Sequence, residues 1–130
     1  MQINTTFIAL GTTLFEEVVT FYRTLCQQEP QVYQAHRYAE FLLPGLKLAI
    51  FVPQTDQELE FSQSRLSGLS LCFSVDNLDT AIAHLQRIGY DQTWKIQTVS
   101  HGRELLVYDP AGNRLIFYSP NAIHDSSSNP

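Results

Sequence analysis

The histidines and cysteines are the residues of this sequence with the widest range of chemistry. His36 stands beside an arginine, and His101 is separated from Arg103 by a single glycine, in segments typical of turns. Cys26 and Cys72 are isolated thiols. Neither His-x-His nor Cys-x-x-Cys spacing occurs, so the sequence contains no recognisable metal-binding motif.

Cys72 is the strongest intrinsic nucleophile in the second half of the chain. A reactive thiol needs a cation or a base that lowers its pKa. Lys47 or Arg114 could supply that charge, whereas a buried, inert thiol is the simpler interpretation. The acidic residues form no evident pair for acid–base catalysis, although His101, Glu104 and Cys72 remain candidates for proton transfer.

Composition excludes several classes of function. The 130 residues carry a net charge of −5 and have no basic block, so nucleic acid is not an expected partner. Hydrophobic residues make up 44% of the sequence, but no apolar run approaches the roughly 20 residues of a membrane span. The first residues lack the pattern of a signal peptide, so we expect a cytoplasmic protein with reduced cysteines.

Two segments of the chain repeat each other. Residues 44–53 align without a gap on residues 111–120, which pairs Gly45 with Gly112 and Lys47 with Arg114. Before each segment, an alternating apolar stretch is followed by helical periodicity. The sequence therefore predicts strands over 5–11 and 69–75 that lead into helices over 14–26 and 77–88. Shorter strands are expected over 31–36, 39–43, 90–98 and 103–108.

The hairpin over residues 108–118 combines turn residues with an apolar strand. Pro110 presets φ, Gly112 and Asn113 tolerate positive φ, and Asp109 can accept hydrogen bonds from the turn. This Asp-Pro-x-Gly-Asn hairpin resembles the closing hairpin of the glyoxalase, bleomycin-resistance and extradiol-dioxygenase superfamily, the vicinal oxygen chelate (VOC) proteins. The pair Phe21-Tyr22 resembles a pair that members carry on their first helix.

The resemblance covers about residues 3–120 and implies an α+β fold. Two βαβββ modules, at about 3–53 and 68–120, would form a curved mixed-sheet cleft in a single domain over 1–120. Residues 54–67 would link the modules, and 121–130 would form a disordered tail.

In metal-using members of that superfamily, ligands project from the first and last strands of each half. The matching positions here are Phe7, Ala49, Ser70 and Ile116. Three of these side chains have no donor atom, and a lone serine is a poor ligand. We therefore expect no metal, no cofactor, and neither glyoxalase I nor metal-dependent dioxygenase activity.

Alternation along the strands predicts which side chains face the cleft. They mix aromatic and small apolar groups with two cations, as pockets for small organic molecules do. The predicted ligand-binding residues are Phe7, Lys47, Ala49, Phe51, Ser70, Cys72, Arg114, Ile116 and Tyr118. The same aromatic residues could instead fill the cleft as core. Trp94 and Arg103 have no assigned facing.

Three functions are compatible with these features. The first is a metal-free protein that sequesters a small, partly apolar organic ligand, as bleomycin-resistance proteins do. The second is a partner-binding subunit with a filled cleft, and the third is a metal-independent isomerase or lyase. The resemblance also implies a homodimer.

Overall fold

The computed structural model describes residues 1–90 and 96–120. Contacts divide the chain into two compact units, Met1–Ser64 and Arg65–Pro130. The division falls within the segment that was predicted to link the modules.

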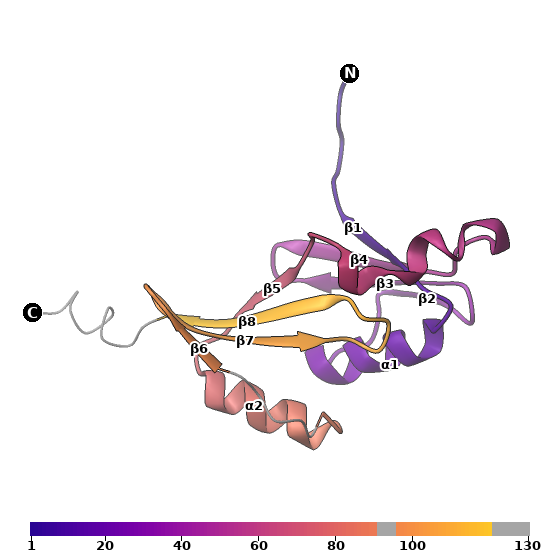
Figure 1. Ribbon diagram of the computed structural model, residues 1–130. Helices are drawn as coiled ribbons and strands as arrows, with labels where there is room; N and C mark the ends of the chain where they lie inside the picture. Colours follow the sequence, from indigo (N-terminus) through magenta and orange to yellow (C-terminus); the bar gives the residue numbers. More distant parts are fainter. Residues whose placement is uncertain (91–95, 121–130) are drawn as a thin grey trace, which may run out of the picture. The chain divides into compact units, whose positions relative to one another are not determined.

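The first unit is a four-stranded sheet with one helix (Figure 1). Its strands are β1 (Ile8–Gly11), β2 (Val32–Gln34), β3 (Tyr38–Leu43) and β4 (Leu46–Phe51), in the order β1-β4-β3-β2. β1 runs parallel to β4, and the other pairs are antiparallel. Helix α1 (Phe15–Cys26) lies along one face of this sheet, where Val18, Val19 and Tyr22 are fully buried.

The second unit repeats this plan. Its strands are β5 (Leu71–Ser74), β6 (Ile96–Val99), β7 (Gly102–Tyr108) and β8 (Arg114–Pro120), in the order β5-β8-β7-β6. Again only the first and last strands pair in parallel. Helix α2 (Leu78–Arg87) buries Leu78 and Leu85. The predicted α+β fold of two βαβββ units is therefore confirmed.

Local signals explain the ends of both helices. The Asn77 side chain accepts a 3.1 Å hydrogen bond from the backbone N–H of Thr80 and so caps α2. Gly89 follows α2 with φ of +101°, the conformation that glycine adopts at little cost. Glu16 and Glu17 occupy the first turn of α1, where the helix dipole favours negative charge.

The predicted linker over 54–67 contains regular turns. It forms three short 3₁₀ turns, η1 (Thr55–Gln57), η2 (Glu60–Ser62) and η3 (Ser64–Leu66). Most of the predicted strand over 90–98 lies outside the described residues, as do Trp94 and the predicted tail at 121–130, and β6 covers Ile96–Val99. No helix that the structure describes combines the length and apolar character needed to cross a membrane.

Candidate functional site

Each sheet has one face that its helix does not cover, which we call its helix-free face. In the first sheet, Phe41 contacts Tyr22 of α1 and therefore lies on the helix-covered face. Phe41 pairs with Leu48, and directly paired residues share a face. Alternation then places Lys47, Ala49 and Phe51 on the helix-free face.

The same reasoning defines the helix-free face of the second sheet. Arg103 lies 3.8 Å from Asp79 of α2, and Arg103 pairs with Ser119. These residues are on the helix-covered face, so Arg103 does not belong with the predicted ligand-binding residues. The opposite face carries Arg114, Ile116 and Tyr118 of β8.

Seven of the nine predicted ligand-binding residues lie within strands, on the helix-free faces. Phe7 and Ser70 each lie one residue before a strand, because β1 and β5 begin later than expected. Ala49 is fully buried between Ala9 and Glu40 in the strand pairing, whereas Cys72 is exposed.

A cluster of polar groups surrounds Glu40 on the first helix-free face. The hydroxyl of Tyr38 donates a 2.5 Å hydrogen bond to Glu40 Oε2, and Lys47 Nζ lies 3.8 Å from Glu40 Oε1. The hydrogen bond to the carboxylate raises the pKa of Tyr38 to about 12, so Tyr38 is the proton donor of this pair. The side chains of Glu40 and Lys47 are 16% and 33% exposed, respectively.

Aromatic rings flank this cluster at both ends. Lys47 Nζ lies 4.5 Å from the centroid of the Phe7 ring, a cation–π distance. The ring of Phe51 has an edge-to-face partner in Phe61 of η2, at 5.3 Å between centroids. A Cβ added to Gly11 would come within 2.7 Å of Phe61, so glycine is what lets this ring approach β1.

Arg114 on the second helix-free face is held by its own unit. Its Nε donates a 2.7 Å hydrogen bond to Ser70 Oγ, and its Nη2 donates to the carbonyl oxygens of Ser67 and Leu69. These contacts commit the guanidinium to the chain that leads into β5. Cys72 is thus neither a buried thiol nor the partner of a free Arg114.

Polar groups surround Tyr118 at the other end of the second helix-free face. Its hydroxyl donates a 2.8 Å hydrogen bond to the carbonyl oxygen of His101, and the two rings lie 5.2 Å apart. Glu104 pairs with Tyr118 across the strands. Leu106, which is 46% exposed, pairs with Ile116, so the middle of this face is apolar.

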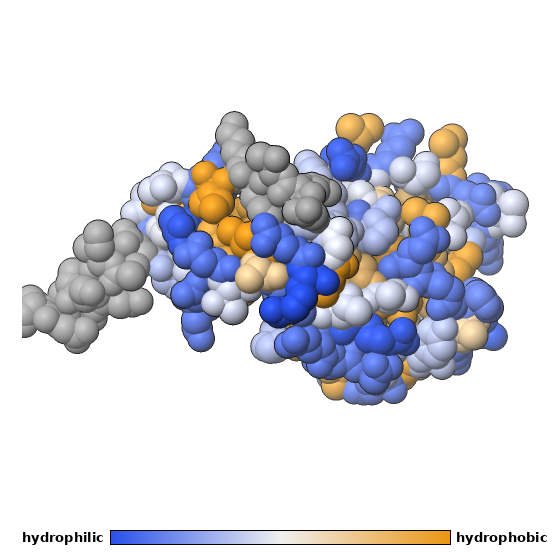
Figure 2. Space-filling model, turned by 90° about the horizontal axis from the view of Figure 1, so that it is seen from below, coloured by the Kyte–Doolittle hydropathy of each residue, from blue (hydrophilic) through white to orange (hydrophobic). Residues whose placement is uncertain are grey.

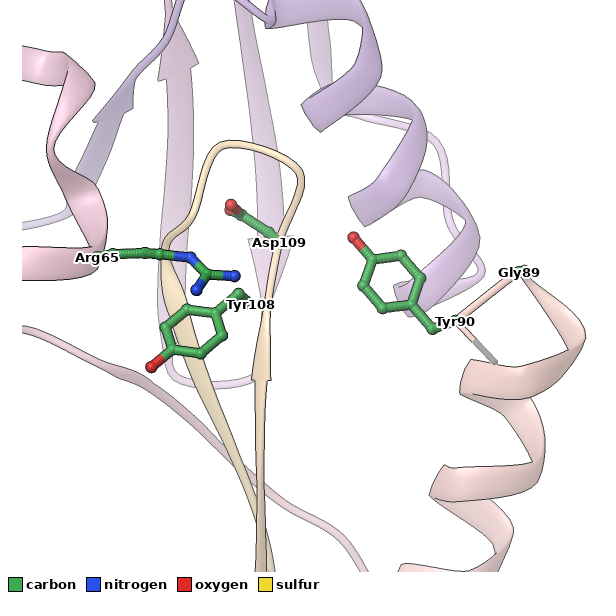
Figure 3. Close-up of a pocket in the computed structure, with 5 residues that line it drawn as sticks. All are labelled: Arg65, Gly89, Tyr90, Tyr108 and Asp109. Atoms are coloured by element: carbon green, nitrogen blue, oxygen red, sulfur yellow. The ribbon is translucent and has the colours of Figure 1, made fainter. Parts of the chain in front are cut away.

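A pocket of about 210 Å³ lies near the closing hairpin of the second unit (Figure 3). It is lined by Arg65, Gly89, Tyr90, Tyr108 and Asp109, none of which was predicted to bind ligand. The guanidinium of Arg65 lies 4.1 Å from the centroid of the Tyr108 ring. Burial, and then the charge of Asp109, raise the pKa of Tyr90 to about 12.

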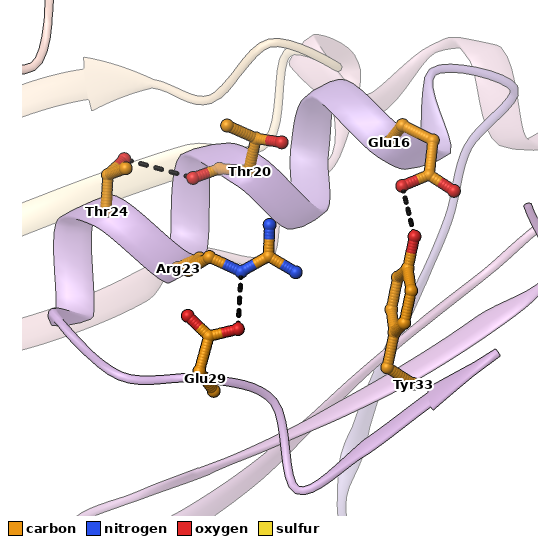
Figure 4. Close-up of polar contacts among 6 residues, drawn as sticks. All are labelled: Glu16, Thr20, Arg23, Thr24, Glu29 and Tyr33. Carbon is orange, nitrogen blue, oxygen red and sulfur yellow. Dashed lines mark hydrogen bonds and ion pairs between the residues drawn. The ribbon is translucent and has the colours of Figure 1, made fainter. Parts of the chain in front are cut away.

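His36 contributes to a polar cluster on α1 and the β2–β3 turn. Glu16 accepts a 2.7 Å hydrogen bond from the Tyr33 hydroxyl (Figure 4). It accepts a second one, also of 2.7 Å, from the His36 backbone N–H. Its carboxylate also lies 3.3 Å from His36 Nδ1. On the same helix, Arg23 Nε is 3.0 Å from Glu29 as an ion pair, although its geometry is not that of a hydrogen bond.

The side chains at the implied metal positions do not fit a divalent ion. The strand neighbours of Ala49 are Ala9 and Glu40, and those of Ile116 are Cys72 and Leu106. Glu40 and Cys72 belong to different units, and each is a single donor. Within residues 1–90 and 96–120, no three His, Cys, Asp or Glu side chains gather into a possible metal site.

Sequence reasoning missed Tyr38 and Glu40. A signal was available: Pro44 and Gly45 form a two-residue turn that pairs Leu43 with Leu46. That register places Glu40 beside Ala49. Phe61 and Arg65, in the supposed linker, had no comparable signal.

No model of a known protein family matches the sequence, and no curated protein does. Solved structures do match. A glyoxalase/bleomycin resistance protein from Catenulispora acidiphila is 21% identical with a TM-score of 0.67, covering 89% of this chain and 97% of that one. A glyoxalase-related enzyme from Fulvimarina pelagi is 20% identical with a TM-score of 0.70, covering 93% and 91%. The chain has the glyoxalase/bleomycin-resistance fold.

A third structure with this glyoxalase/bleomycin-resistance fold contains a ligand. It is a bleomycin-binding protein in complex with bleomycin, 16% identical with a TM-score of 0.63, covering 92% of this chain and 100% of that one. At this identity the likeness establishes the fold alone. The chemistry of this glyoxalase-like chain must come from its own side chains.

Proposed function

We propose that this protein binds a small, partly apolar organic molecule on one of the helix-free faces of its two sheets, without a metal ion. The observation that carries the proposal is the make-up of these faces, which place Phe7, Leu106 and Ile116 among a few polar groups. Sites for small molecules have this balance of apolar surface and placed polar groups. The bleomycin-binding protein of the same fold is a precedent for binding.

A native mass spectrum of the protein purified from its own organism tests this proposal. We expect a bound molecule of small mass and no stoichiometric metal. The variants Leu42→Trp and Cys72→Trp each add a tryptophan at an exposed position, on the first and the second helix-free face respectively, so at least one of them should reduce the bound fraction. The fully buried Ala49 is a poorer choice, since a tryptophan there would disturb the fold.

Ala83→Trp is the matched control, because it adds a tryptophan at an exposed position on α2. It should leave the bound fraction unchanged. A protein free of ligand, or a ligand retained equally by Leu42→Trp, Cys72→Trp and Ala83→Trp, would contradict the proposal.

Binding of a protein partner is the second candidate. Exposed leucines favour it: Leu59 lies between η1 and η2, Leu66 ends η3 and Leu69 follows it, and each presents most of its surface to solvent. Figure 2 shows hydrophobic patches between hydrophilic residues on one face of the molecule. A native mass spectrum that shows a second polypeptide and no small molecule would favour this function.

We also propose that the protein is a homodimer. Within the described residues, β1 and β2 form the edges of the first sheet, and β5 and β6 form those of the second. Open edges require cover. Sedimentation equilibrium at about 50 µM should give twice the 14.8 kDa mass of the chain. A monomer at this concentration would contradict the proposal.

A further inference from the structure

The carboxylate of Glu40 lies in the helix-free face of the first sheet with its two oxygens in different situations. Oε2 accepts the hydrogen bond from Tyr38. Oε1 has only the ammonium of Lys47, at 3.8 Å, which is beyond hydrogen-bonding distance. Glu40 Oε1 therefore lies near the positive charge of Lys47 but accepts no hydrogen bond from any described residue.

Partial burial makes it costly for Glu40 Oε1 to lack a hydrogen-bond donor. The Glu40 side chain is 16% exposed, so little solvent reaches it, while some access remains. A carboxylate oxygen in such a position gains more from a charged donor than a fully solvated one does.

The cations of both helix-free faces are already engaged. Lys47 divides its ammonium between Glu40 and the ring of Phe7. Arg114 donates to Ser70 and to two backbone carbonyls. An anionic ligand would have to displace these contacts, whereas a cationic one needs only to replace a loosely held ammonium.

Phe7 provides apolar surface next to Glu40 and Lys47 on the first helix-free face. Its side chain is 42% exposed, and it precedes β1 on the same face as Lys47. An aromatic ligand can stack on a ring of this kind. The net charge of −5 also attracts cations to the protein as a whole.

We infer that the first helix-free face binds the ammonium or amidinium group of a flat aromatic cation, and that Glu40 is the residue that determines this preference. The inference rests on the proposed function and names the chemical class of its ligand. Lys47 then acts as an internal competitor, because its ammonium occupies the place that the ligand's cation takes.

Benzamidine and benzoate test this inference, since they share a ring and differ in charge. Each is titrated into the ¹⁵N-labelled protein while the backbone amide signals of β3 and β4 are followed. We expect benzamidine to bind more tightly than benzoate. Glu40→Gln should weaken benzamidine roughly tenfold or more, the effect of losing a hydrogen bond to a charged group.

Lys47→Met should have the opposite effect and strengthen benzamidine roughly twofold to fivefold, the range of a partly exposed ion pair. Glu17→Gln is the matched control: it makes the same chemical change at an exposed position on α1, which covers the opposite face of the first sheet, and should leave the affinity for benzamidine unchanged.

Several results would overturn the inference. One is tighter binding of benzoate than of benzamidine. Another is weaker binding of benzamidine by Lys47→Met than by the unaltered protein. Either result would mean that Lys47 helps to hold the ligand instead of competing with it. Benzamidine binding that ignores Glu40→Gln also overturns it. If benzamidine fails to bind a protein that retains its native ligand, only this inference fails; if the native mass spectrum is also empty, the proposed function fails with it.

Discussion

The Nε of Arg114 donates a 2.7 Å hydrogen bond to the Oγ of Ser70 and thereby connects the first residue of β8 to the residue that precedes β5. Both residues were expected to face a ligand, and they face each other. Two further hydrogen bonds from the same guanidinium fix the carbonyl groups of Ser67 and Leu69. Arg114 therefore fixes the entry of the chain into β5.

Replacing Arg114 with Ala should lower the free energy of unfolding by about 1–3 kcal/mol, because one partly buried and two exposed hydrogen bonds are lost. Urea denaturation measures this change. Arg103→Ala is the control, since Arg103 is in a long, exposed ion pair worth little. Equal stability of the two variants would show that the contacts of Arg114 contribute nothing.

Asp109 organises the closing hairpin, and its loss should be more damaging. It is buried, and its carboxylate accepts hydrogen bonds from the backbone N–H groups of Ala111 and Asn113 and from the Asn113 side chain. We expect Asp109→Ala to lower the free energy of unfolding by about 2–4 kcal/mol. Asp56→Ala, at an exposed position in η1, should change it by less than about 0.5 kcal/mol in the same urea experiment.

Glu16 should titrate below its ordinary pKa of 4.5. The hydrogen bond from Tyr33 is the largest cause, followed by that from the His36 backbone. Because the folded pKa is depressed, the resulting stability is present above the unfolded value and is lost as pH falls through the folded one. Carbon-13 NMR of the glutamate carboxyl groups should show the pKa of Glu16 rising in Tyr33→Phe. Tyr38→Phe, on the opposite face of the sheet, should leave it in place.

The two thiols should differ in reactivity. Burial raises the pKa of Cys26 to about 11, whereas Cys72 is exposed. Since the thiolate is the nucleophile, Ellman's reagent at pH 8 should modify Cys72 first and Cys26 about tenfold or more slowly. Cys72→Ser should abolish the fast phase, and Cys26→Ser should preserve it. A fast phase that survives in Cys72→Ser would reverse the assignment.

The internal repeat, the local patterns and the family resemblance together predicted the fold. The helix over 77–88 was found from its apolar spacing, and the structure places α2 at Leu78–Arg87 with Asn77 as its cap. The repeat of 44–53 in 111–120 corresponds to β4 and β8, which occupy the same position in their sheets. Periodicity carries this information because one face of each element must be buried.

The candidate site was harder to predict, because its contacts join residues that the sequence keeps apart. Ser70 and Arg114 are far apart in the chain and meet only once β5 pairs with β8. Glu40 was overlooked because the facing of its strand depends on the register set at Pro44 and Gly45. The thiol of Cys72 was expected to be buried, but alternation assigns a face without saying how well that face is covered.

The close approach of Phe61 to Gly11 limits what evolution or a designer can change. Every other residue type at position 11 introduces a Cβ that would come within 2.7 Å of the Phe61 ring and 2.8 Å of the Phe51 ring. Gly68 has open space around its added Cβ and is under no such restriction. Two glycines of equal appearance in the sequence thus differ in tolerance: position 68 has room for a side chain, while position 11 can change only together with positions 51 and 61.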